Sequence, residues 1–138
     1  MTSTDYVTDK RTSERMRRVR SRETNPEKVV RRLLTQMGYR YRLHRTDLPG
    51  QPDIVFSGRR KIVFVHGCFW HRHRGCSRCS MPKKNVPLWE EKFSRTVVRD
   101  RRNVRRLKKL DWDVLIVWEC SVANEAKLKG RLKSFLED

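Results

Sequence analysis

The sequence lacks any long apolar run. No segment approaches the roughly 18 apolar residues that a membrane-spanning helix needs, and no apolar stretch typical of a secretory leader lies near the N-terminus. Internal repeats and low-complexity tracts are also missing. We therefore expect a soluble intracellular protein, and 138 residues are enough for one domain with a buried core.

Acidic residues are scarce. The chain has 16 Asp and Glu residues against 34 Lys and Arg residues, which gives a formal net charge of +18. Such an excess favours a polyanionic partner, and nucleic acid is the usual one. The alternative is that the basic side chains merely cover solvated surfaces. The size of the excess favours nucleic acid.

Cysteines number only four, and three of them lie within residues 68–79. Without a secretory leader, disulfides are a weaker interpretation than a metal site in a reducing compartment. Sulfur and imidazole ligands at short spacing are typical of structural zinc. Four tetrahedral positions have five candidates, which are Cys68, His73, Cys76, Cys79 and Cys120. A local site would use Cys79, whereas a site closed by tertiary contact would use Cys120, and the second is favoured because Cys120 directly follows a predicted strand.

Two regions are expected along the chain. Residues 1–22 form a basic N-terminal arm that is partly disordered, and residues 10–22 carry seven Lys and Arg residues, among them Arg17 and Arg18. We expect this arm to order along a phosphate backbone, the alternative being a solvated tail. Residues 23–138 form the compact domain.

The hydrophobic pattern predicts a mixed α/β domain, in which a central sheet is flanked by helices. The first helix is capped by Asn25 and stops at Gly38. Strands are expected at 39–43, 53–56, 61–66 and 114–118, helices at 88–110 and 123–136, and a long loop at 67–87. The strands at 53–56 and 61–66 are joined as a hairpin. The near-continuous apolar strand at 114–118 is expected in the middle of the sheet.

Carboxylates near the hairpin could hold a hard cation. Asp53 precedes a buried strand, and the hairpin would bring Asp53 near Val65 at the end of the next strand. Mg²⁺ takes a carboxylate, backbone carbonyls and phosphate oxygens, so Asp53 and the carbonyl of Val65 are candidate ligands. Glu27 is the natural additional carboxylate. Considered without the other, Asp53 would be a turn residue at the start of a strand, and Glu27 would be an acidic residue that interacts favourably with the helix dipole.

The residues between the strand end and the cysteines suit catalysis and base stacking. His66 and His71 are not needed as metal ligands, so either can exchange a proton with water. Phe69 and Trp70 are adjacent in a loop and are not expected to point into one core. They could wedge between base pairs, the alternative being packing over the zinc. Trp89 is ambiguous in the same way, because it also fits the apolar stripe of its helix.

These motifs resemble the very-short-patch mismatch repair endonucleases (Vsr). The resemblance runs from about residue 12 to the end of the chain. It rests on residues 48–53 (LPGQPD), 65–71 (VHGCFWH), 81–82 (MP), 89 (W), 99–100 (RD) and 117–120 (VWEC).

The resemblance implies a fold akin to type II restriction endonucleases, of the PD-(D/E)XK-related kind, with a structural zinc loop. It also implies a Mg²⁺-dependent nick on the 5′ side of the thymine in a T:G mismatch that arises from deamination of 5-methylcytosine. The partners would be mismatched double-stranded DNA and mismatch-repair proteins. The protein would be a monomer in the bacterial cytoplasm, associated with the nucleoid.

The resemblance also implies roles for individual residues. Asp53 and the Val65 carbonyl would bind Mg²⁺, and His71 would be the general base, assisted by His66 and Glu27. The intercalating side chains would be Phe69, Trp70 and Trp89, the zinc ligands would be Cys68, His73, Cys76 and Cys120, and the arm with Met16 would lie along the DNA groove.

Three positions depart from the family pattern. Val65 replaces a threonine, which is harmless if only the carbonyl binds metal. One additional residue separates His73 from Cys76, which leaves Cys79 a rival ligand, and Thr96 replaces an asparagine. Two other functions share the basic charge. One is a zinc-stabilised DNA-binding module without catalysis, and the other is a restriction-type nuclease that cuts matched duplex.

Overall fold

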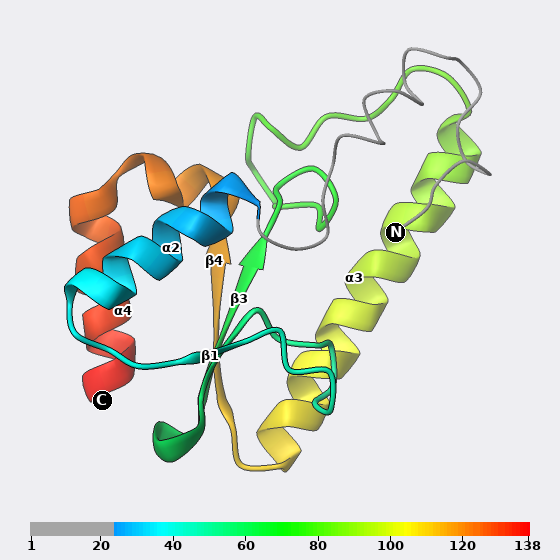
Figure 1. Ribbon diagram of the computed structural model, residues 1–138. Helices are drawn as coiled ribbons and strands as arrows, with labels where there is room; N and C mark the ends of the chain where they lie inside the picture. The colour runs from blue at the N-terminus through cyan, green and yellow to red at the C-terminus, as the bar shows by residue number, and fades with distance from the viewer. Residues whose placement is uncertain (1–23) are drawn as a thin grey trace.

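A computed structural model describes residues 24–138 (Figure 1). The predicted arm, with Met16, Arg17 and Arg18, lies outside the described residues. The elements are α2 (Asn25–Gln36), β1 (Arg42–Leu43), β2 (Ile54–Phe56), η2 (Ser57–Arg59), β3 (Lys61–His66), α3 (Val86–Lys109), β4 (Asp113–Trp118), η3 (Glu119–Ala123) and α4 (Glu125–Glu137). In the part described, no helix is both long and apolar enough to cross a membrane.

The four strands form one mixed sheet in the order β1-β2-β3-β4. The pairs β1–β2 and β2–β3 are antiparallel, which confirms the predicted hairpin, and β3–β4 is parallel. The expectation that the strand at 114–118 lies in the middle of the sheet was wrong, because β4 is an edge strand among the described residues. Its apolar sequence reflects the covering of both its faces and carries no information about its lateral position.

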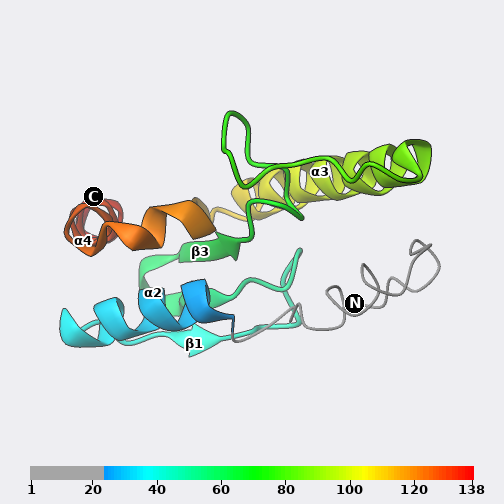
Figure 2. The ribbon, with the colours of Figure 1, turned by 90° about the horizontal axis from the view of Figure 1, so that it is seen from above.

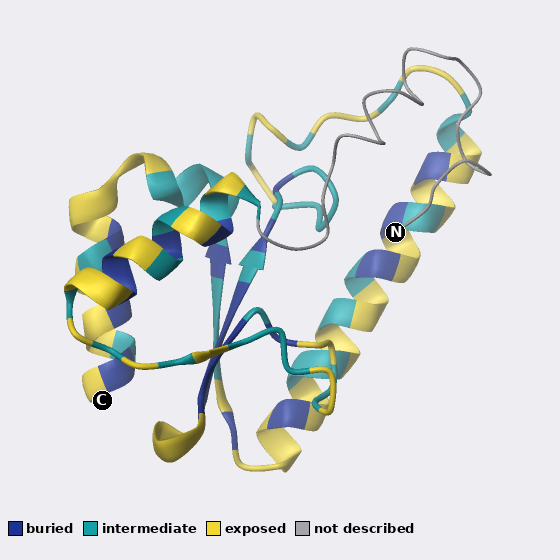
Figure 3. Cartoon of the chain, viewed as in Figure 1, coloured by how far each residue is buried: buried dark blue, intermediate teal, exposed yellow. Residues whose placement is uncertain are grey.

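Helices cover both faces of the sheet, as the apolar pattern predicted. In Figure 1 the sheet is seen nearly edge-on, with α2 and α4 on one side and α3 on the other, and Figure 2 shows the same layers from above. Alternate residues of β3 divide between the two cores: Val63 packs with α2 and α4, whereas Ile62 and Phe64 pack with Leu107 of α3. Burial is continuous along β2 and along the start of β3 (Figure 3).

Element ends differ from the predictions by a few residues. Thr24, rather than Asn25, caps α2, and its hydroxyl accepts a hydrogen bond from the Glu27 amide at 3.4 Å. The helix predicted at 88–110 begins two residues earlier, because Pro87 is compatible with the first turn of a helix. The strand expected at 39–43 is reduced to the two residues of β1. Tyr41 turns back toward α2, where its hydroxyl bonds the Arg31 carbonyl at 3.3 Å.

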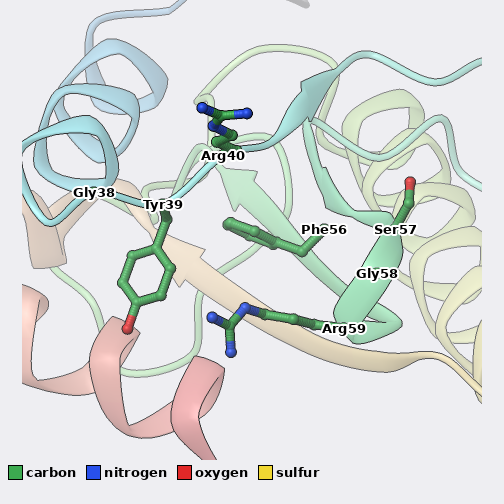
Figure 4. A pocket seen from close by; sticks show the side chains of 7 residues that line it. All are labelled: Gly38, Tyr39, Arg40, Phe56, Ser57, Gly58 and Arg59. Carbon is green, nitrogen blue, oxygen red and sulfur yellow. The ribbon is translucent and has the colours of Figure 1, made fainter.

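A shallow hollow lies at the Phe56 end of β2, opposite to Asp53 (Figure 4). Its walls hold α4 in place: Arg59 lies over the ring of Tyr39 at 5.3 Å and donates a hydrogen bond to the Leu136 carbonyl at 3.0 Å. The Tyr39 hydroxyl donates to Glu137. The polar groups of this hollow are therefore engaged in packing the C-terminal helix.

Gly50 marks the place where the loop before β2 touches α3. It has a φ of +78°, and a Cβ there would lie 3.1 Å from both Asn103 Cβ and Phe64 Cζ. We expect Gly50→Ala to lower the free energy of unfolding by about 2 kcal/mol, through left-handed strain and the clash. Urea denaturation measures this. Gly58→Ala is the control, because a Cβ at Gly58 meets nothing within 4 Å, and equal midpoints for the two variants would contradict the prediction.

Candidate active site and metal centre

The parallel pairing of β3 and β4 sets the frame of the site. The last residues of the two strands, His66 and Trp118, are directly paired. Cys68 and Cys120 each follow two residues later, so both leave the same edge of the sheet at the same level. This is the edge at which open α/β sheets place their ligand sites.

A cluster of three cysteines and one histidine gathers beyond this edge. One donor atom from each of Cys68, His73, Cys76 and Cys120 lies within 4.8 Å of the others, so the cluster could hold a metal ion. The His73 Nδ1 atom is 3.6 Å from Cys68 Sγ and 3.4 Å from Cys120 Sγ. Cys79 is not in the cluster. The arrangement closed by tertiary contact is the one found.

Side chains around the cluster fix its orientation. The ring of His73 stacks on Trp118, with centroids 4.3 Å apart and planes 7° from parallel. The amide of Cys68 donates to Glu119 at 3.3 Å. Burial raises the pKa of the Cys68 thiol to about 12 in the metal-free protein, so a bound cation would be needed to hold this sulfur as a thiolate.

A second cluster joins Glu27 of α2, His44 after β1 and Asp53 before β2. One ligand atom of each lies within 4.8 Å of the others. The His44 Nε2 atom is 2.9 Å from Glu27 Oε2. Asp53 Oδ2 accepts a hydrogen bond from the amide of Val65 at 2.8 Å. The proximity of Glu27, Asp53 and Val65 that the sequence predicted is therefore present.

Burial dominates the electrostatics of this second cluster. It raises the pKa of Asp53 from 3.8 to about 6, against the opposing effect of the Val65 hydrogen bond, and the charge of Glu27 adds to the rise. Glu27 is 1% exposed. Two carboxylates held so close in a buried place suit a divalent cation, which would offset their repulsion.

The third cluster is formed by His66, His71 and Asp100. The rings of His66 and His71 stack with centroids 3.8 Å apart and planes 8° from parallel. The His71 Nδ1 atom is 2.6 Å from Asp100 Oδ2, on α3. Because an ionised carboxylate can only accept hydrogen bonds, we assign the proton to Nδ1, which leaves Nε2 free to take a proton. Asp100 thus has the partner that its place on an apolar stripe requires.

His66 is the buried member of the stack. It is 6% exposed, and burial lowers its pKa to about 3, with the neighbouring His71 adding to the effect. His66 is therefore neutral across the physiological pH range. Of the two histidines, His71 is the better placed to exchange a proton with a substrate, since 25% of its side chain is exposed.

The three predicted intercalating residues lie together. Phe69 and Trp70 pack against Trp89 and Phe93 of α3, with the Phe69 and Trp70 ring centroids 5.1 Å apart. The expectation that Phe69 and Trp70 would not share one core was wrong. They lie in a tight turn in which the His71 amide bonds the Gly67 carbonyl at 3.1 Å, so their side chains do not alternate as in a strand. Trp89 is 3% exposed.

Two further residues of the site carry weak sequence signals. His44 was not predicted, although it follows a predicted strand, and its amide bonds the Asp53 carbonyl at 3.0 Å. The antiparallel register of residues 39–43 against 53–56 was the signal that could have found it. Phe93 lies on the predicted stripe but joins the aromatic group. Along α3, eight Lys and Arg side chains from Arg95 to Lys109 are exposed, as the charge pattern indicated.

Comparisons with known proteins agree with this geometry. Residues 4–78 match the family described as DNA mismatch endonuclease Vsr. The type II nicking enzyme V.XorIIP of Xanthomonas oryzae pv. oryzae is 46% identical over 134 residues, which are 97% of this chain and 98% of that protein. The DNA mismatch endonuclease Vsr of Escherichia coli K12 is 44% identical over 123 residues, 88% of this chain and 78% of that protein. V.NmeAIP of Neisseria meningitidis is 38% identical over 135 residues, covering 98% of this chain and 96% of that protein.

The fold, the clustered histidines and carboxylates and these relatives define the class. The protein is a DNA nicking endonuclease, a hydrolase that acts on DNA. The chain belongs to the Vsr family of DNA mismatch endonucleases.

The cysteine cluster predicts a specific pattern of metal loss. Cys120→Ser should release the metal and lower the melting temperature, because it removes a donor 3.4 Å from His73 Nδ1. Cys79→Ser should keep the metal, because Cys79 is outside the cluster. Metal content by mass spectrometry and melting curves of the purified variants test this. Full metal content in Cys120→Ser, or loss of metal in Cys79→Ser, would indicate that Cys79 is a metal ligand.

The raised pKa of Asp53 predicts a pH-dependent stability difference. The folded protein binds a proton at Asp53 more tightly than the unfolded chain, so stability falls as pH rises from about 4 through about 6. In buffer without added divalent cation, Asp53→Asn should be more stable than the wild type at pH 7.5, by at most about 3 kcal/mol. The difference should vanish near pH 4. The prediction would be contradicted if urea denaturation gave the same difference in free energy of unfolding between Asp53→Asn and the wild type at both pH values.

Proposed function

We propose that the protein is a Mg²⁺-dependent endonuclease that nicks one strand on the 5′ side of the thymine in a T:G mismatch, and so begins very-short-patch repair. One observation carries the chemistry. The carboxylate cluster contacts β3 at Val65, and the imidazole stack begins at the next residue, His66. The groups proposed to bind the cation and the ring that supports the proposed proton acceptor, His71, thus adjoin consecutive residues of one strand.

The ligands for the cation come from Asp53, the Val65 carbonyl and Glu27. Mg²⁺ prefers oxygen donors, which suits two carboxylates and one carbonyl. When bound, such an ion polarises the scissile phosphate and stabilises the charge that develops on it. The hydrogen bond from the Val65 amide holds the Asp53 carboxylate in place.

His71 is the general base in this proposal. Asp100 accepts a hydrogen bond from Nδ1–H and fixes the ring, so that Nε2 can take a proton from the attacking water. His66 supports the ring from one face by stacking. Because burial keeps His66 neutral, it does not oppose the positive charge that His71 acquires.

The cysteine cluster fits a structural zinc ion. Tetrahedral zinc with bonds of about 2.3 Å to sulfur and about 2.0 Å to nitrogen places the two ligand atoms about 3.5 Å apart. The observed separations from His73 Nδ1 to the sulfurs of Cys68 and Cys120 are 3.6 and 3.4 Å. All four ligands come from the chain, so the ion would hold the loop that carries His71 and take no part in cleavage.

Mismatch recognition would come from the aromatic residues. Phe69 and Trp70, which are half-buried in the DNA-free protein, would insert beside the T:G pair together with Trp89, since a wobble pair is easier to unstack than a matched one. Trp89 would have to leave its buried place. The arm with Met16, Arg17 and Arg18 and the exposed basic residues of α3 would contact phosphates without reading sequence.

Several broader features belong to the same proposal. Residues 1–22 would act as the DNA-binding arm and residues 23–138 as an endonuclease domain related to type II restriction enzymes. The protein would act as a cytoplasmic monomer on nucleoid DNA, alongside mismatch-repair proteins. A DNA-binding module without catalysis has no need of the His71–Asp100 pair, which favours the nuclease.

A nicking assay on two duplexes that differ only in a T:G or T:A pair tests the proposal. With Mg²⁺, we expect one nick 5′ of the thymine in a T:G duplex and none in the T:A duplex of the same sequence. His71→Ala should lower the nicking rate roughly 10²- to 10⁴-fold, and Asp53→Asn should lower it at least as far, while both still bind DNA in a gel-shift assay. Equal cutting of the T:A duplex would favour the restriction-type nuclease. Unchanged nicking by His71→Ala would show that His71 is not the general base.

A further inference from the structure

We propose that His44 completes the cation site as a nitrogen ligand, so that the site of Glu27, His44 and Asp53 binds Mn²⁺ more tightly than Mg²⁺. This inference rests on the proposed function, because it concerns the same cation. It adds a nitrogen ligand to the oxygen ligands of the proposed function, and this ligand gives the site a preference for Mn²⁺ over Mg²⁺.

The geometry suits a shared ion. The three ligand atoms lie within 4.8 Å of one another. Adjacent donors around an octahedral ion with bonds of about 2.1 Å are about 3.0 Å apart, and His44 Nε2 lies 2.9 Å from Glu27 Oε2. The same separation serves as a hydrogen bond when no ion is bound, so the imidazole is already placed where an ion between the carboxylates could reach it.

The backbone places His44 at this point. Its amide bonds the Asp53 carbonyl at 3.0 Å, which continues the β1–β2 pairing one residue beyond β1. Its φ of +50° lies in the left-handed region, which residues other than glycine seldom adopt. Such residues concentrate at functional sites, where the surrounding structure holds them. Only 16% of the His44 side chain is exposed.

The donor chemistry sets the preference. Carboxylate and carbonyl oxygens suit Mg²⁺ and Mn²⁺ alike, whereas an imidazole adds affinity for first-row transition metals. Glu27 is already paired with Arg31 at 3.6 Å, which weakens it as a ligand for a cation. A nitrogen ligand beside Asp53 therefore contributes a larger share of the binding of Mn²⁺ than it would beside two carboxylates without such a pairing.

Electron paramagnetic resonance tests the inference on the zinc-loaded, DNA-free full chain. The signal of free aqueous Mn²⁺ reports binding, and pulsed spectra report coupling to an imidazole nitrogen. We expect His44→Gln to weaken Mn²⁺ binding roughly tenfold or more and to remove the nitrogen coupling, with Mg²⁺ competition changed less than about twofold. Arg45→Gln, next in the chain, is the matched control and should behave as the wild type. His71→Asn should keep the coupling, which excludes His71 as its source.

The outcomes separate this inference from the proposed function. Equal Mn²⁺ affinity in wild type and His44→Gln, or nitrogen coupling that survives His44→Gln, would overturn the role of His44. If Asp53→Asn abolishes binding while His44→Gln does not, only the nitrogen ligand fails. If Asp53→Asn binds Mn²⁺ as the wild type does, or the wild type binds none, the cation site of the proposed function fails as well.

Discussion

The parallel pairing of β3 with β4 is the constraint on which the rest of the site depends. Because His66 and Trp118 are paired, the two chain segments that supply the cysteines start from the same level. Cys68 and Cys120 can then meet His73 without any change in the sheet. A slip of one residue would turn the side chains of one strand to the opposite face and would separate the two sulfurs. The hydrogen-bond ladder of the sheet thus determines whether the metal cluster exists.

Ring contacts join the cluster of three cysteines and His73 to His71, the proposed general base. The Trp118 ring stacks on His73 and meets His66 edge-on at 5.4 Å, and His66 in turn stacks on His71. The far side of His71 is held by Asp100 of α3. The imidazole is therefore positioned on one side by the loop that carries the cysteine cluster and on the other side by a helix. Movement of either support would change the direction of its free nitrogen.

The sequence predicted the parts of this arrangement that follow from local pattern. Two apolar runs separated by a short connection predicted the hairpin, and with it the meeting of Asp53 and Val65, while the place of Cys120 after a strand predicted the cluster closed by tertiary contact. The edge position of β4 was out of reach, because its apolar residues report only that both faces are covered. His44 was missed for a related reason, since only the register of the first strand against the second could have identified it. Its partner is set by the register of β1, and a two-residue strand has no periodicity to detect.

Two strained residues and a buried carboxylate lie near one another where the chain enters β2. His44, whose amide bonds the Asp53 carbonyl, and Gln51, two residues before Asp53, have positive φ of +50° and +47°, as do four other non-glycine residues elsewhere in the described chain. At the same place the pKa of Asp53 is raised by burial. Each feature lowers stability, so the apolar packing on the two faces of the sheet must offset it. Strain that persists against such a cost is typical of a segment that holds a ligand in place, and His44 is the strained residue whose ring lies with the Glu27 and Asp53 carboxylates.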